Sequence, residues 1–167
     1  VPRLFDAWDI DSNYRECGFE TPVVESMAVD CAQGLAASLT WTGRVGASAI
    51  RQTISVQVGS PVVTFDTTVD WHELHRLLKV EFPVSVQASE GINEIQFGYL
   101  KRPTHRSRLY DSDRFEVCNQ RYSALCDESH GAAVLNDCKY GISMKENALQ
   151  LTLLRAPAAP EMRADNG

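Results

Sequence analysis

A run of polar residues follows an apolar segment late in the chain and ends in a glycine. Its sequence is Asn136-Asp137-Cys138-Lys139-Tyr140-Gly141, directly after Leu135. Amide, carboxylate, ammonium and phenol groups on a loop at the end of a strand are well placed to reach a ligand. A turn in which Asn and Asp side chains bond to their own backbone explains the same run equally well. From the residues alone, both interpretations stay open.

A second candidate group lies near the first residue, where carboxylates alternate with apolar and aromatic side chains. Asp6, Asp9 and Asp11 stand among Phe5, Trp8 and Ile10. A pair of carboxylates is the machinery of glycoside hydrolysis, in which one acts as acid and the other as nucleophile or base. An aromatic ring beside carboxylates suits a sugar ring. Carboxylates that are solvated or that cap neighbouring backbone are the alternative.

Two further segments carry groups with possible chemistry. His72-Glu73-Leu74-His75 is one residue short of the helical zinc pattern, in which histidines at i and i+4 flank a general base. On a strand, residues three apart point to opposite faces, so we assign no metal ligand here. The basic run Arg102-Pro103-Thr104-His105-Arg106 could clamp a carboxylate or phosphate. A solvated loop or a contact with another domain is the alternative for this run.

Composition restricts the class of protein that could present these groups. The 167 residues include 16 basic and 22 acidic ones, a net charge of -6, which argues against nucleic-acid or anionic-membrane partners. Apolar runs are only a few residues long, so no membrane span is expected. The five cysteines are irregularly spaced and odd in number, which favours reduced thiols in an intracellular, cytoplasmic protein.

The elements that must position these groups are predicted to be β-strands. Side chains alternate between apolar and polar with a period of two, and Gly, Pro, Asn or Asp separate the runs. The clearest strands are 50–58, 63–71 and 78–86, and weaker ones are 35–41, 94–99, 132–135 and 149–154. Pro83 indicates an edge strand or a bulge. A short helix over 71–78 is the less favoured alternative for that segment, and the pattern as a whole predicts an antiparallel sandwich or barrel.

Taken together, these segments resemble the C-terminal β region of glycoside hydrolase family 38 α-mannosidases, of the bacterial and cytosolic or vacuolar branch. The resemblance follows the chain in order through 5–11, 69–73, 77–80, 94–98, 102–106, 114–117, 135–141 and 151–155. Two segments depart from the family pattern. Cys118-Asn119-Gln120-Arg121-Tyr122 stands where the family usually has Pro, a small residue, His, Arg and Trp, and Ala156-Pro157-Ala158-Ala159-Pro160 replaces Ser-Pro-Thr-Tyr-Pro.

The resemblance implies a fold and an activity. We expect an all-β, antiparallel β-sandwich with little or no helix over 1–154, partial and cut from a longer chain, and an irregular tail over 155–167. The parent enzyme would hydrolyse terminal α-mannosides with retention of configuration. Its zinc and its aspartate nucleophile would belong to an N-terminal catalytic barrel that this chain lacks. The 167 residues alone are therefore expected to be inactive, to bind no cofactor, and to serve as scaffold and active-site wall for that barrel.

The residues expected to contact an α-mannoside or oligosaccharide follow from the two polar groups above. The first set is Asn136, Asp137, Lys139 and Tyr140, and the second is Asp6, Trp8 and Asp9. Amide and carboxylate groups would bond to sugar hydroxyls, and Trp8 or Tyr140 would form an aromatic wall. The competing functions are a non-catalytic carbohydrate-binding module and a structural or dimerisation domain. Exposed strands could also join copies of the chain into a homo-oligomer.

Overall fold

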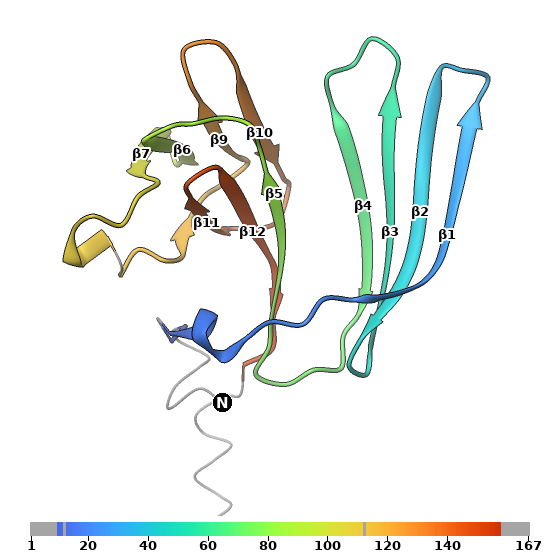
Figure 1. Cartoon of the computed structure of the whole chain (residues 1–167), viewed down its shortest axis with the longest axis horizontal. Coiled ribbons are helices and arrows are strands. Elements are labelled where there is room, and N and C mark those ends of the chain that lie inside the picture. Colours follow the sequence, from blue (N-terminus) through green and yellow to red (C-terminus); the bar gives the residue numbers. More distant parts are fainter. Residues whose placement is uncertain (1–9, 12, 112, 158–167) are drawn as a thin grey trace, which may run out of the picture. The chain divides into compact units, whose positions relative to one another are not determined.

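The computed structural model describes residues 10–11, 13–111 and 113–157 (Figure 1). Within them lie twelve strands and two short 3-10 helices, η1 (Tyr14–Cys17) and η2 (Leu109–Asp111). No α-helix occurs in this part of the chain. The prediction of an all-β, antiparallel protein is therefore confirmed. The described residues divide into two compact units, one over Arg15–Leu74 and the other over those that lie within Val1–Tyr14 and His75–Gly167.

The unit over Arg15–Leu74 is a single antiparallel sheet in which each strand pairs with the next along the chain. Its order is β1 (Val23–Ala32), β2 (Ala36–Val45), β3 (Ser48–Gln57) and β4 (Val63–Asp70). The strands predicted at 50–58 and 63–71 are confirmed as β3 and β4. The turn between them contains Gly59 at φ 78°, a left-handed conformation that glycine adopts at little cost.

The two faces of this sheet differ in chemistry because side chains alternate along each strand. Hydroxyl groups pair across strands on one face, where Thr40 Oγ1 and Thr53 Oγ1 lie 2.9 Å apart. On the opposite, mainly apolar face, Trp41 Nε1 donates to Gln52 Oε1 at 3.1 Å, and Gln52 Nε2 donates to Thr67 Oγ1 at 2.8 Å. These two hydrogen bonds join β2, β3 and β4 through their side chains.

Strand β1 was absent from the sequence prediction, and its local geometry gives the reason. The pairing of β1 with β2 shifts register between Val24 and Ser26, so that Glu25 is an extra residue in the strand. A bulge of this kind interrupts the period-two alternation on which the prediction depends. The apolar residues before and after Glu25 therefore fall out of phase in the sequence.

The other unit contains two four-stranded antiparallel sheets. The first has the order β5 (Leu77–Pro83), β12 (Ala148–Arg155), β11 (Gly141–Lys145) and β8 (Val117–Cys118). The second has the order β10 (Gly131–Leu135), β9 (Tyr122–Cys126), β6 (Glu90–Ile95) and β7 (Gly98–Pro103).

The two sheets of this unit pack face to face around one core. Leu125 of β9 clusters with Ile142 of β11 and Leu149 of β12, and none of the three is more than 1% exposed. Val86, just after β5, is buried with them. The sheets approach closely at Gly91, where an added Cβ would lie 2.4 Å from Met144 Cε. The unit is therefore a β-sandwich with an apolar core cluster.

Three predictions for the segment 71–99 have different outcomes. β5 is an edge strand that ends at Pro83, as Pro83 indicated, although the predicted strand continued to residue 86. The strand predicted over 94–99 is wrong, because Ile95 pairs with Gly98 across a tight turn and the segment belongs to two strands. Phe97 in that turn is fully exposed, so its apolar character had no core to fill. Residues 71–76 form a connection without helix.

Candidate functional site

The polar loop over 136–140 connects β10 to β11, and Asn136 fixes its shape. Asn136 Oδ1 accepts a hydrogen bond from the backbone N of Lys139 at 2.7 Å. Such a bond from an Asn side chain to the backbone three residues on closes a turn. The turn interpretation therefore holds for Asn136 itself, while the side chains of Asp137, Lys139 and Tyr140 take no part in this hydrogen bond.

A second loop, between β8 and β9, holds the first one in place. Asn136 Nδ2 donates to Asn119 Oδ1 and to Gln120 O, each at 3.2 Å. Two backbone bonds reinforce the contact: Asn136 N donates to Arg121 O at 2.8 Å, and Asn119 N donates to Tyr140 O at 2.9 Å. The two loops are thereby joined at both ends, which gives the polar loop a defined conformation.

The remaining side chains of the loop are available to a ligand. Asp137 is exposed, Lys139 is half-buried, and Tyr140 is 60% exposed. Asp137 hydrogen-bonds the neighbouring Cys138 thiol and thereby raises the pKa of Cys138. The thiol is thus kept protonated rather than activated as a nucleophile. A carboxylate and a phenol on a fixed loop form a surface that can bond to sugar hydroxyls and contact a sugar ring.

The second predicted set, Asp6, Trp8 and Asp9, lies outside the described residues. The structure therefore brings together one of the two predicted groups, Asn136, Asp137, Lys139 and Tyr140.

Sequence reasoning missed the residues behind this loop. Asn119 is 2% exposed and accepts the bond from Asn136. Glu94 supports the same loop, since its carboxylate Oε2 accepts from Arg121 N at 2.7 Å and its carbonyl accepts from Gln120 N at 3.0 Å. The sequence offered one signal of this support: the segment 118–122, which contains the buried Asn119, differs from the family pattern.

The described residues contain no group of three or more His, Cys, Asp or Glu that could hold a metal ion. His72 Nε2 lies 3.0 Å from Asp70 Oδ1, and both side chains are more than half exposed. These residues therefore do not offer a site that fits a catalytic zinc. Within the same residues, no helix is long and apolar enough to cross a membrane.

Comparison with known proteins gives the family of the chain. Residues 1–163 match the family described as the glycosyl hydrolases family 38 C-terminal domain. Alpha-mannosidase 2C1 from Homo sapiens is 43% identical over 171 residues, a match covering all of this chain and 16% of that protein. An alpha-mannosidase from Saccharomyces cerevisiae is 44% identical over 106 residues, covering 63% of this chain and 10% of that protein.

A solved structure shows the same fold at low sequence identity. The crystal structure of an alpha-mannosidase from Enterococcus faecalis V583 superimposes with a TM-score of 0.71 and 14% identity. The match covers 86% of this chain and 21% of that one. The chain thus spans between a tenth and about a fifth of the relatives it matches. On the family match and the identity to the curated relatives, the chain belongs to glycoside hydrolase family 38 and corresponds to the C-terminal domain of its α-mannosidases.

Proposed function

We propose that this segment forms part of the active-site wall of a retaining, zinc-dependent α-mannosidase that hydrolyses terminal α-mannosides. The observation behind the proposal is the fixed loop over 136–140, which presents Asp137 and Tyr140 outward on a buried amide support. Asp137 would accept hydrogen bonds from sugar hydroxyls, and the Tyr140 ring would pack on the sugar. Lys139, Asn136, and the residues Asp6, Trp8 and Asp9 are proposed to complete the contact.

The chemical step is assigned to another part of such an enzyme. A retaining mechanism needs two carboxyl groups about 5 Å apart and a covalent glycosyl intermediate. We propose that an N-terminal catalytic barrel supplies the nucleophile and holds the zinc, and that the 167 residues alone do not turn over substrate.

We further place the segment in the bacterial and cytosolic or vacuolar branch of the family, with a cytoplasmic location. Its five cysteines are all free and exposed, which suits a reducing compartment.

A structural or dimerisation role is the second candidate, and one observation favours it. Apolar side chains on the sheet of Arg15–Leu74 are unusually exposed, with Val29 at 68%, Met27 at 61% and Phe65 at 41%. Exposed apolar groups gathered on one face commonly mark an interaction surface. Under this proposal the sheet would join another domain or a second copy, and the polar loop would have no ligand.

The test compares hydrolysis of an aryl α-mannoside by the 167-residue chain and by a complete α-mannosidase polypeptide that contains it, with and without a metal chelator. We expect turnover only in the complete polypeptide, and we expect chelation to abolish it. Turnover without metal would overturn the zinc assignment. Absence of turnover in both preparations would leave the structural role as the better explanation.

A further inference from the structure

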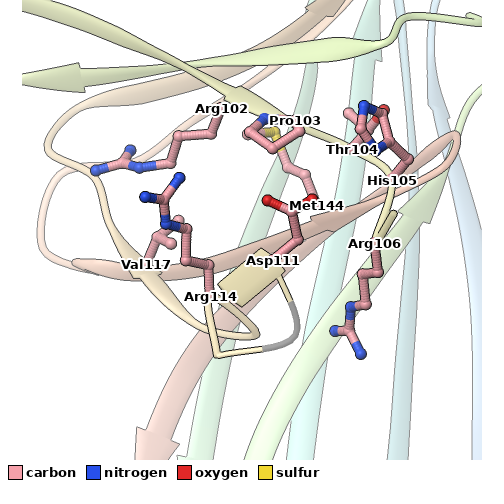
Figure 2. A pocket seen from close by; sticks show the side chains of 9 residues that line it. All are labelled: Arg102, Pro103, Thr104, His105, Arg106, Asp111, Arg114, Val117 and Met144. Carbon is pink, nitrogen blue, oxygen red and sulfur yellow. The ribbon is translucent and has the colours of Figure 1, made fainter. Parts of the chain in front are cut away.

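A pocket in the sandwich unit is lined by basic side chains that the proposed mannosidase role does not use. Arg102 lines it from the end of β7, and Arg114 lines it from the segment after η2. Thr104, His105, Arg106 and Asp111 also line the pocket (Figure 2). The concentration of arginines is notable because the whole chain has a net charge of -6.

The arginines that line this pocket are not held in ion pairs within the described part of the chain. None of Arg102, Arg106 and Arg114 forms an ion pair with a residue that the structure describes. Figure 2 shows the guanidinium groups of Arg102 and Arg114 turned to the same side of the pocket, while Arg106 points away. Two arginines that line one pocket and form no ion pair there favour the binding of an anion, which would also lie beside the Asp111 carboxylate.

Both guanidinium groups are held in position before any ligand arrives. One terminal nitrogen of Arg102 donates to Asn93 Oδ1 at 2.7 Å and to Cys118 O at 3.3 Å. Asn93 is fully buried and is itself bonded to Ser123 Oγ at 2.8 Å. The guanidinium carbon of Arg114 lies 5.3 Å from the centroid of the Tyr110 ring, a cation–π contact. Such preorganisation lowers the entropic cost of binding.

Asp111 adds a hydrogen-bond acceptor to the same pocket. Asp111 is only 4% exposed, and its Oδ2 accepts a hydrogen bond from Arg108 N at 3.0 Å. The hollow has a volume of about 20 Å³, which is room for one oxygen-sized group. An anion bound here would therefore place one hydroxyl beside the carboxylate and its charged oxygens between the arginines.

We propose that Arg102 and Arg114 form a binding site for a small hydroxyl-bearing oxyanion, namely a phosphate that is either free or attached to a sugar. Arg102 and Arg114 bond to the phosphoryl oxygens, and the Asp111 carboxylate accepts from the hydroxyl. The proposal is independent of mannoside hydrolysis, because none of its residues belongs to the polar loop.

The test is calorimetric titration of the 167-residue chain with inorganic phosphate at low ionic strength, against a chloride titration. Arg114→Gln is the informative variant, because the contact that the structure shows for Arg114 is the Tyr110 ring. We expect this variant and Arg102→Gln each to bind phosphate roughly tenfold or more weakly, since each loses charge-assisted hydrogen bonds. The matched control is Arg51→Gln, an exposed arginine on β3 in the other unit, and it should bind as the unmodified chain does.

Far-UV circular dichroism of each variant separates loss of binding from loss of fold. If Arg102→Gln unfolds, Arg114→Gln decides the question alone. Mannose 6-phosphate and mannose in parallel titrations distinguish the source of the anion: tighter binding of the sugar phosphate identifies an attached phosphate, and equal binding identifies the free ion. Absence of phosphate binding, or binding unaffected by Arg114→Gln in a folded protein, would overturn the proposal.

Discussion

Asn136 Nδ2 donates to Asn119 Oδ1 at 3.2 Å, which joins the exposed loop between β10 and β11 to a side chain that is 2% exposed. The loop that presents Asp137 and Tyr140 is therefore supported from inside the protein. Its geometry depends in part on Asn119, a buried residue that no ligand needs to touch. Changes in the support and changes in the presented groups should consequently have different effects, which the first two predictions separate.

Asp137→Ala, made in the complete α-mannosidase polypeptide, should lower kcat/KM for an aryl α-mannoside by about tenfold to a hundredfold. The estimate corresponds to loss of one hydrogen bond from a charged group. Stability should change by less than about 0.5 kcal/mol, because the side chain is exposed. Steady-state kinetics together with urea denaturation check both parts. Full activity in this variant would remove Asp137 from the substrate site.

Asn136→Ala should destabilise the 167-residue chain by about 1–3 kcal/mol. The change removes the acceptor of Lys139 N and both bonds to the β8–β9 loop. Equilibrium urea denaturation measures the loss, with Asp137→Ala as the matched neighbour that should leave the midpoint unchanged. If the two variants had equal stability, the loop lock would be energetically unimportant.

Lys79→Met should cost about 3–5 kcal/mol, because it leaves a carboxylate largely buried and without its cation. Lys79 Nζ donates to both oxygens of Glu116, at 2.9 and 2.6 Å, and the two side chains are only 15% and 12% exposed. The double variant Lys79→Met with Glu116→Leu should recover much of that loss. A double variant as unstable as the single one would show that the loss comes from packing rather than from the unpaired charge.

Gly91→Ala should destabilise the sandwich unit by about 1–3 kcal/mol through overpacking. Its Cβ would lie 2.4 Å from Met144 Cε and 3.3 Å from Leu125 Cδ2. Gly98→Ala, in the same hairpin, meets no atom within 4 Å and serves as the control. Thermal unfolding should separate the two variants by several degrees. Equal melting temperatures would mean that Met144 moves aside at no cost.

The turn between β9 and β10 should stabilise the protein by an amount that decreases as the pH becomes acidic. Hydrogen bonds from the backbone N atoms of Ser129 and His130 lower the pKa of Asp127 to about 2, from an ordinary value of 3.8. A carboxyl whose pKa is lower in the folded state stabilises above its unfolded pKa, and that stabilisation disappears as the pH falls through the folded pKa. The difference in melting temperature between the unmodified chain and Asp127→Asn should be constant above about pH 5 and shrink toward pH 2. A difference independent of pH would contradict this account, and Glu128→Gln is the exposed control.

The sequence predicted most of the fold where alternation was unbroken. β3 and β4 follow a clean period of two, and Pro83 correctly marked β5 as an edge strand. The failures occurred where local geometry interrupts the period. The bulge at Glu25 hid β1, and the tight turn at Phe97 divided a segment that looked like one strand.

The candidate site was only partly predictable for a different reason. The polar run over 136–140 is visible because its residues are consecutive and follow an apolar strand. Its supports, Asn119 and Glu94, come from segments that lie 17 and 42 residues before Asn136, and only the strand pairing brings them together. Arg102 and Arg114 come to line one pocket in the same way, through the path of the chain after β7.

The hydrogen bonds from Trp41 through Gln52 to Thr67 also have a consequence for the assembly of their sheet. If β2, β3 or β4 slipped by one residue, its side chain in this set would point to the opposite face of the sheet. The hydrogen bonds to the neighbouring strands would then be lost. Apolar side chains alone tolerate many alignments, since one valine packs nearly as well as another. The Gln52 side chain accepts a hydrogen bond from Trp41 and donates one to Thr67, so both bonds form in only one alignment of the strands. It thus selects a single alignment of β2, β3 and β4 among the many that hydrophobic packing would permit.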